Sequence, residues 1–294
     1  MIPVPSRILY TSHFVNASAP KNEWRLYWHI REALKSYYTN KKSKFKRAFT
    51  MNISFNDIFK YSDILNPISP STLFQAGKLA GLDANKIILD LGSGKGSPSI
   101  LWASLFGVQV EGYDFGSAFV QYANSHAELL NLSHRVKFYC KDIKELKVTR
   151  TYDVVAFLGL GITHIFGNSH TALKQLRTML HKDGVLFLAE PIWLANDIPL
   201  AIRENLDAAE EGFFTKSELL QIVEHCGFQI KESFDSLKED WEVYIRPVNY
   251  AMREIIKNTS ELAEEAQVVI NNFKAEYDAV NQYWNMVLCV AKAI

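Results

Sequence analysis

Short apolar runs alternate with amphipathic stretches through the middle of the chain. The apolar runs are rich in β-branched residues, predict buried strands and span residues 87–91, 108–114, 136–140, 152–157 and 185–191. Between them, apolar residues recur at helical spacing and predict helices over residues 99–106, 116–130 and 168–180. Strands that alternate with helices predict an α/β fold with a mostly parallel sheet.

The C-terminal third adds two strands with a long segment between them. Thr215 is a suitable cap for a helix that ends at Gly227, and apolar runs predict strands over residues 228–234 and 283–291. The connecting segment, residues 235–282, is much longer than a usual connection between strands. We therefore predict a helical lid inserted between the last two strands.

Most of the predicted lid is one amphipathic helix. Its apolar residues recur at helical spacing and are Leu262, Ala266, Val269, Ile270, Phe273, Tyr277 and Val280. Thr259, Ser260 and Glu261 are suitable cap and dipole partners at its start. The periodicity predicts that this helix docks one apolar face on the rest of the protein.

Residues 1–70 predict a separate helical cap at the N-terminus. Apolar and aromatic residues recur at helical spacing over residues 22–38 and predict an amphipathic helix. Residues 41–47 carry five positive charges, which indicates either a solvated linker or a contact with RNA, anionic lipid or an acidic partner.

An acidic residue and three alternate glycines follow the first predicted strand. The sequence from residue 87 to 98 is Ile-Ile-Leu-Asp-Leu-Gly-Ser-Gly-Lys-Gly-Ser-Pro, with Asp90 ahead of Gly92, Gly94 and Gly96. The glycines allow a sharp strand-to-helix turn and leave backbone N–H groups open to a ligand at the helix N-terminus. The glycine spacing differs from that of a dinucleotide site, and the order of glycine and lysine excludes a Walker A loop.

This pattern resembles motif I of the class I S-adenosylmethionine (SAM) dependent methyltransferases, which is apolar-apolar-Asp-x-Gly-x-Gly-x-Gly. The resemblance implies a cofactor loop made of Asp90, Gly92, Ser93, Gly94 and Gly96. The next predicted strand ends in Asp114, about 20 residues after the loop, where such folds place a carboxylate for the ribose hydroxyls. Phe115 follows it and completes this part of the expected site.

Two later strand ends extend the resemblance. In the family, an acidic residue after the third strand accepts a hydrogen bond from the adenine amine, and the next residue packs on the adenine ring. Asp142 and Ile143 hold these positions. An Asp after a strand is also a common helix cap, which is the alternative role for Asp142. Leu158 and Gly159 follow the fourth predicted strand, in a loop that is expected to face the methionine part of the cofactor. The Asn-Pro-Pro-aromatic motif of DNA-base and glutamine-amide methylation is absent there, which leaves O, S, C and aliphatic N acceptors open.

Motifs V and VI of the small-molecule branch of these methyltransferases resemble a further part of the chain. This part consists of the helix over residues 168–180, the Lys-Asp-Gly turn after it and a strand ending in Glu190. The specific resemblance covers residues 86–193. It implies a doubly wound, Rossmann-like sheet of seven mostly parallel strands with an antiparallel last strand. The expected SAM-binding domain covers residues 71–294.

The resemblance implies a methyltransferase that moves a methyl group from SAM to a small molecule and leaves S-adenosylhomocysteine. In-line transfer requires alignment of donor and acceptor and exclusion of water, and residues 55–70 and the lid are suited to cover the cleft. If the acceptor must lose a proton, His164 is the first candidate base and Glu190 the second, against packing or turn roles for both. The residues that could line the acceptor pocket, or else belong to the core, are Trp241, Tyr244 and Tyr250.

Composition agrees with a globular enzyme. The 294 residues are 48% hydrophobic and 22% charged with zero net charge, so nothing attracts the whole molecule to nucleic acid or acidic lipid, and nucleic acid is not expected as a partner. Cys140, Cys226 and Cys289 are scattered and indicate neither a metal site nor a disulfide framework. Since neither a membrane span nor a signal peptide is recognisable, the expected location is the cytoplasm.

Three other functions stay open. The protein could methylate RNA or protein with the help of residues 41–47. It could be an NAD-linked oxidoreductase, which the glycine spacing disfavours, or a protein that binds SAM without turning it over. The sequence predicts neither the acceptor nor the oligomeric state.

Overall fold

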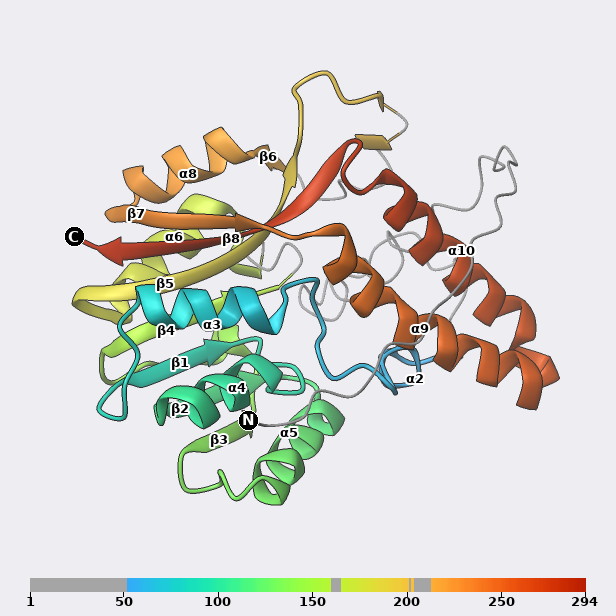
Figure 1. The fold of residues 1–294 in the computed structure, drawn as a ribbon, viewed down its shortest axis with the longest axis horizontal. Coiled ribbons are helices and arrows are strands. Elements are labelled where there is room, and N and C mark those ends of the chain that lie inside the picture. Colours follow the sequence, from blue (N-terminus) through green and yellow to red (C-terminus); the bar gives the residue numbers. More distant parts are fainter. Residues whose placement is uncertain (1–51, 160–164, 201, 204–212) are drawn as a thin grey trace, which may run out of the picture.

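The computed structural model describes residues 52–159, 165–200, 202–203 and 213–294 (Figure 1). They form an α/β fold on one eight-stranded sheet with the order β3-β2-β1-β4-β5-β8-β7, and β6 pairs with β5 off this path. The strands are β1 (Ile87–Leu91), β2 (Gln109–Asp114), β3 (Val136–Cys140), β4 (Tyr152–Leu158), β5 (Leu180–Trp193), β6 (Phe214–Thr215), β7 (Phe228–Asp235) and β8 (Trp284–Ala293). The predicted helix over residues 22–38, the basic residues 41–47 and His164 lie outside the described residues.

The strand directions confirm the predicted Rossmann-like arrangement. β1 to β5 pair in parallel, and β8 runs antiparallel to both β5 and β7. The two-residue strand β6 is additional to the seven predicted strands, because so short a run carries no periodic pattern. It pairs in parallel with Ile192 and Trp193 at the end of β5.

Strand β5 is longer than predicted at both ends. The predicted turn over residues 181–184 is an irregularity inside the strand, where the register against β4 shifts. At the other end, Glu190 does not end the strand as predicted, since the chain continues through Pro191 to Trp193 while still paired with β8. Proline has no N–H group to donate to a neighbouring strand. Pro191 is tolerated because the pairing of β5 with β4 has already ended at Ala189.

Helices cover both faces of the sheet. They are α3 (Pro70–Leu79), α4 (Ser97–Phe106) and α5 (Ser117–Leu129) on one face and α6 (Ser169–Thr178) and α8 (Lys216–His225) on the other. Successive strand residues point to opposite faces, so Ile88 belongs to the first core and Leu89 to the second. Figure 1 shows α3 and α4 in front of the central strands.

The predicted helix boundaries are confirmed where cap residues specify them. Thr215 forms a capping box with Glu218 at the start of α8. Gly107 ends α4 with φ 72°, and Gly227 follows α8 with φ 90°. Both glycines adopt the left-handed conformation that commonly terminates a helix.

A hairpin of two helices lies between β7 and β8. Its members are α9 (Lys238–Asn258) and α10 (Ala263–Ala279), joined by the short helix η3 (Ser260–Leu262). The insertion is therefore present where the sequence predicts it, but the prediction that one helix makes up most of it was wrong. The predicted cap by Thr259 is also not formed, because its side chain makes no capping bond.

Helix α9 forms although it contains a proline. Pro247 lies inside the helix and removes a backbone hydrogen bond. A stripe of buried residues that includes Trp241, Tyr244 and Val248 outweighs this loss by docking on the core. Helices α9 and α10 each bury one side and pack against each other.

The helical hairpin lies beyond the carboxyl ends of the parallel strands. β7 leads into α9 at this edge, and α10 returns the chain into β8 (Figure 1). Open α/β sheets bind ligands beyond the same edge. Among the described helices, none combines the length and apolar character required to cross a bilayer.

Candidate active site

The loop between β1 and α4 makes the turn that its glycines require. Gly92, Gly94 and Gly96 have φ values of 70°, 53° and 75°. The backbone N–H groups of Gly92 and Ser93 donate to the carbonyl of Tyr113, at 2.8 and 3.1 Å, and tie the loop to β2. The buried Ser93 hydroxyl makes no hydrogen bond among the described residues.

Two positions near the loop, Gly96 and Gly112, require glycine because the ring of Phe138 on β3 packs directly against them. A Cβ atom on Gly96 would lie 2.4 Å from Cζ of Phe138, and one on Gly112 would lie 2.3 Å from Cδ1 of the same ring. A Cβ atom on Gly94 would lie 2.8 Å from Cδ1 of Leu65. Any larger residue at Gly96 or Gly112 would therefore displace Phe138 from the core.

Asp114 joins the end of β2 to the glycine loop. Its Oδ2 accepts from the N–H of Gly94 at 2.9 Å, and its Oδ1 accepts from the N–H of Gly116 at 2.8 Å. The side chain is buried, with 8% exposure; burial raises the pKa of its carboxyl, and the two backbone bonds act in the opposite direction. The structure therefore brings together the two predicted cofactor elements, although they lie about 20 residues apart in sequence.

Asp90 is held inside the fold behind the loop. Ser99 donates its hydroxyl to Oδ2 of Asp90 at 2.6 Å, which links β1 to the first turn of α4. Burial raises the pKa of Asp90 to about 7; the bond from Ser99 lowers it and the nearby Asp114 raises it further. The carboxyl of Asp90 thus braces the strand-to-helix turn.

The residues predicted to surround the adenine lie at the end of β3. Asp142 caps the short helix η1 (Ile143–Glu145) by accepting from the N–H of Lys144 at 2.9 Å, which is the alternative role considered for it. Ile143 is buried, and the N–H of Lys141 donates to the carbonyl of Asp114 at 2.8 Å. The ends of β2 and β3 are thereby adjacent, with Phe115 half-buried next to Asp114.

The ends of β4 and β5 complete the described part of the site. The carbonyl of Leu158 accepts from Nδ2 of Asn66 at 3.1 Å, and Gly159 is half-buried beside it. Glu190 is buried within β5, where its backbone pairs with Val287 of β8. The structure thus brings Asp90, Asp114 and the glycine loop together. His164 lies outside the described residues, and the catalytic role of Glu190 stays a prediction.

The segment from α2 (Phe55–Ile58) to Ser69 lies over the glycine loop, and we call it the cover segment. The amine of Lys95 donates to the carbonyls of Phe59 and Lys60, at 2.8 and 3.2 Å. Ser97 donates to the carbonyl of Asp63, and Tyr122 donates to its carboxylate. These bonds tie the cover segment to the glycine loop and to α5, and its role in covering a bound cofactor stays a prediction.

Lys95 was not predicted as a site residue. It is buried, burial lowers the pKa of its amine, and Asp63 opposes this effect. No spacing rule identifies such a lysine, because it occupies a variable position of the glycine motif and its partners are backbone carbonyls. Only its place between Gly94 and Gly96 could have suggested it.

Aromatic contacts join the cover segment to the helical hairpin. The ring of Phe59 lies 6.1 Å from that of Tyr244 and 6.2 Å from that of Phe273. Tyr61 contacts Tyr250, with 4.9 Å between ring centroids. Of the three predicted pocket residues, Trp241 and Tyr244 are thus buried, whereas Tyr250 is exposed.

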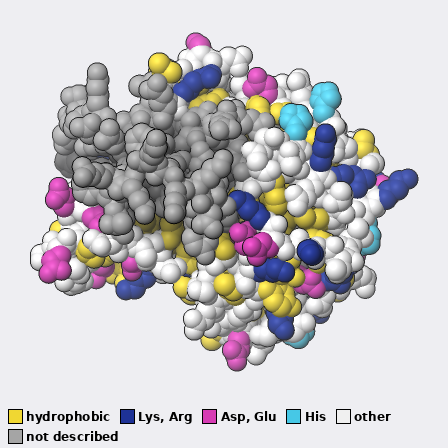
Figure 2. All heavy atoms as spheres, turned by 180° about the vertical axis from the view of Figure 1, so that it is seen from behind, with side chains coloured by type: hydrophobic (Ala, Val, Ile, Leu, Met, Phe, Trp, Pro, Cys, Tyr) yellow, Lys and Arg dark blue, Asp and Glu magenta, His cyan; other side chains and the backbone are white. Residues whose placement is uncertain are grey.

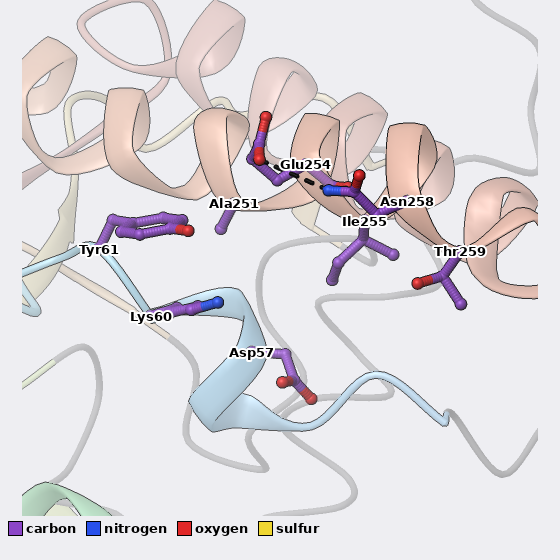
Figure 3. Close-up of a pocket in the computed structure, with 8 residues that line it drawn as sticks. All are labelled: Asp57, Lys60, Tyr61, Ala251, Glu254, Ile255, Asn258 and Thr259. Atoms are coloured by element: carbon purple, nitrogen blue, oxygen red, sulfur yellow. Dashed lines mark hydrogen bonds between the residues drawn. The ribbon is translucent and has the colours of Figure 1, made fainter.

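A pocket of about 190 Å³ opens along this seam (Figure 3). The residues that line it come from α2 and the turn after it on one side, and from the second half of α9 and its C-cap on the other. They are Asp57, Lys60, Tyr61, Ala251, Glu254, Ile255, Asn258 and Thr259. The cover segment and the hairpin are therefore in contact at their aromatic residues but leave a gap beside them.

Comparison with known proteins identifies the family. A family model described as a methyltransferase domain matches residues 82–267. The chain belongs to this methyltransferase family. A curated relative, the uncharacterised protein YjhP of Escherichia coli K12, is 28% identical over 199 residues, which cover 67% of this chain and 77% of the relative.

Solved structures of methyltransferases share the fold of this methyltransferase. A SAM-dependent methyltransferase from Thiobacillus denitrificans, in complex with S-adenosyl-L-homocysteine, is 26% identical with a TM-score of 0.73 and covers 82% of this chain and 98% of its own. One from Geobacter sulfurreducens, with the same ligand, is 24% identical with a TM-score of 0.75 and covers 82% and 97%. The prediction of a class I methyltransferase with a Rossmann-like fold is confirmed.

Replacing Lys95 by methionine is expected to release the cover segment. The variant loses two hydrogen bonds from a charged donor, so backbone amides of residues 55–63 should exchange hydrogen about 10-fold faster. Hydrogen exchange followed by mass spectrometry measures this directly. Lys78→Met, on the exposed surface of α3, is the matched control, and equal protection in the two variants would contradict the role of Lys95.

The raised pKa of Asp90 predicts a pH dependence of stability. Since the carboxyl titrates near pH 7 in the folded protein and near pH 4 when unfolded, the folded state binds the extra proton between these values. The contribution of Asp90 to the stability of the wild type should therefore fall as pH rises from about 4 to about 7 and stay constant above that. Asp90→Asn should lose this part of the dependence, which denaturant unfolding at pH 5 and pH 8 measures; identical pH dependence in both proteins would be inconsistent with a buried, titrating Asp90.

Proposed function

We propose that this protein transfers the methyl group of SAM to a small-molecule acceptor. The observation that carries the proposal is the contact between Asp114 and Gly94, which joins the two elements expected to hold the ribose and the methionine part of SAM. Membership of a methyltransferase family supports the same donor. The solved relatives that bind S-adenosyl-L-homocysteine support it further.

The residues of the loop fit this cofactor. The buried hydroxyl of Ser93 lacks a partner among the described residues and is available to a ligand. The proposed cofactor residues are Asp90, Gly92, Ser93, Gly94, Gly96, Asp114, Phe115, Asp142, Ile143, Leu158 and Gly159. Bound SAM supplies a methyl group that its sulfonium already activates for displacement.

The protein's own task is then to align the acceptor and exclude water. The cover segment and the helical hairpin lie over the carboxyl edge of the sheet and are suited to this task, with His164 and Glu190 as candidate bases if the acceptor must lose a proton. We assign residues 1–70 to a helical cap and residues 71–294 to the methyltransferase domain, in which residues 235–282 act as a lid.

A small acceptor fits the surface better than a nucleic acid. Positive and negative side chains lie interspersed over the described part of the face in Figure 2, and the whole chain has zero net charge. An extended nucleic acid site requires a basic surface. Methylation of RNA or protein through residues 41–47 remains the alternative.

Methyl transfer from labelled SAM tests the proposal. The methyltransferase and methyl-labelled SAM are incubated in three separate reactions with fractions of a cell extract. The fractions are the dialysable small molecules, the total protein and the total RNA. The expected result is label on a dialysable compound that separates from SAM by chromatography, formed much more slowly by Asp114→Ala at a SAM concentration that does not saturate the variant. Label confined to RNA or protein would establish the alternative, and SAM binding without transfer to any fraction would mean that the protein is not a catalyst of this reaction.

A further inference from the structure

Two polar side chains are buried side by side on helix α10. Asn272 is 3% exposed and Glu276 is 5% exposed. They lie four residues apart, so they share one face of the helix, and the buried residues Val269 and Ala279 continue the same stripe. The polar pair thus interrupts the apolar face with which the helix packs.

This pair lacks the partners that buried polar groups normally have. Neither side-chain atom of Asn272 makes a hydrogen bond within the part of the chain that the structure describes. Burial alone raises the pKa of Glu276 to about 8, with no opposing effect from a nearby cation. Because unpaired buried groups destabilise a fold, native proteins retain few of them. A ligand that binds to both side chains would explain why the hairpin retains two unpaired buried polar groups next to each other.

The pair lies at the carboxyl edge of the sheet, where the acceptor should bind. Nε1 of Trp284 donates to the backbone carbonyl of Glu276 at 3.3 Å, and Trp284 pairs with Trp193 at the end of β5. Phe273, next to Asn272, contacts Phe59, whose carbonyl accepts from Lys95 of the glycine loop. The neighbourhood of the pair is therefore linked to the proposed cofactor site through the cover segment.

Aromatic side chains surround this part of α10. Trp284 contacts Trp241 with 4.9 Å between ring centroids, and Phe273 contacts Tyr244 at 6.1 Å. Trp193 also has a buried indole N–H without a partner among the described residues. An apolar, aromatic wall with a few unpaired polar groups is the usual composition of a small-molecule site.

We propose that Asn272 and Glu276 bind the amino group of the methyl acceptor, which is then an aliphatic amine with an apolar portion. An ammonium group compensates the ionised carboxylate of Glu276, whereas an alcohol meets only the neutral carboxyl and gains no charge-assisted hydrogen bond. For transfer, Glu276 takes one proton from the ammonium group. The nitrogen lone pair then attacks the methyl carbon, and the bond from sulfur to that carbon breaks to leave S-adenosylhomocysteine. The carbonyl oxygen of Asn272 accepts a second N–H, and aromatic faces attract cations. This inference rests on the proposed methyltransferase function and selects aliphatic nitrogen from the acceptor atoms left open by the sequence.

Calorimetric titration of the S-adenosylhomocysteine complex tests the assignment with two probes of one shape, phenethylamine and 2-phenylethanol. The amine is expected to bind at least about 10-fold more tightly than the alcohol, as for a charge-assisted hydrogen bond. Glu276→Gln should remove this preference and leave S-adenosylhomocysteine binding unchanged. Asn271→Leu, whose amide pairs with Gln267 on the surface of the same helix, is the matched control and should keep the preference.

The other outcomes of the titration would overturn either the amine assignment or the methyltransferase function itself. Equal affinity for amine and alcohol, no binding of the amine, or an unchanged preference in Glu276→Gln would overturn the amine assignment while S-adenosylhomocysteine still binds. If S-adenosylhomocysteine itself does not bind to the wild type, the proposed methyltransferase function fails first. The two failures are therefore distinguishable.

Thermal unfolding without ligand gives a second, independent test. If the pair is kept for a ligand, replacing it by apolar residues should stabilise the empty protein. Asn272→Leu and Glu276→Met are each expected to raise the unfolding temperature by about 2 °C or more. A lower unfolding temperature in both variants would show that the fold itself uses these groups, which would overturn the assignment.

Discussion

Replacing Asp114 by alanine is expected to weaken the binding of SAM by about 10- to 100-fold, the range for hydrogen bonds to a charged group. The proposed role of Asp114 is to accept from the ribose hydroxyls, and in the structure its carboxylate also holds the N–H groups of Gly94 and Gly116. The substitution therefore removes a ligand contact and the brace that orients the loop. Calorimetric titration with SAM measures the loss.

Two further variants separate these effects from a general disturbance of β2. Asp114→Asn keeps a carbonyl acceptor but not the charge, and it should show an intermediate loss of affinity. Glu111→Gln alters a carboxylate on the same strand that pairs with Arg150, away from the strand end, and should bind SAM as the wild type does. Unchanged affinity in Asp114→Ala, with the protein folded, would remove Asp114 from the cofactor site.

Replacing Gly96 by alanine is expected to reduce the free energy of unfolding by about 2 to 4 kcal/mol, the sum of overpacking and left-handed backbone strain. The added Cβ would approach the ring of Phe138 to 2.4 Å, at a position where φ is 75°. Phe138 is buried in the core against β2, so the clash should also disturb the glycine loop and reduce SAM affinity. Denaturant unfolding followed by SAM titration measures both.

Gly81→Ala is the matched control for backbone strain. Gly81 has a similar φ of 62°, but no atom lies within 4 Å of the Cβ position. The free energy of unfolding of Gly81→Ala should therefore fall by only about 1 kcal/mol, which is the strain of the left-handed conformation, and the variant should keep its affinity for SAM. Equal losses in the two variants would mean that the contact with Phe138 does not decide the need for glycine at position 96.

The sheet and the cofactor loop could be predicted because their signals are local. Strands β1 and β4 are short apolar runs, and the glycines after β1 permit the left-handed backbone of the loop, which other residues rarely adopt. Asp114 could be predicted as well, because the length of a strand-helix-strand unit fixes where the second strand ends. These elements are specified by residues close together in sequence.

The remaining features depend on contacts between distant segments. Helix α9 was missed because Pro247 conceals a stripe whose stability comes from docking on the core. Lys95 binds backbone carbonyls of the cover segment, which no sequence pattern encodes. The unpaired state of Asn272 likewise follows only from what packs around α10.

Calorimetric titration of the wild-type protein with SAM, S-adenosylhomocysteine and NAD tests the central claim most directly. A glycine loop built for SAM should bind both sulfur nucleosides with micromolar affinity and should not bind NAD. Binding of NAD without either sulfur nucleoside would contradict the account and assign the loop to an oxidoreductase.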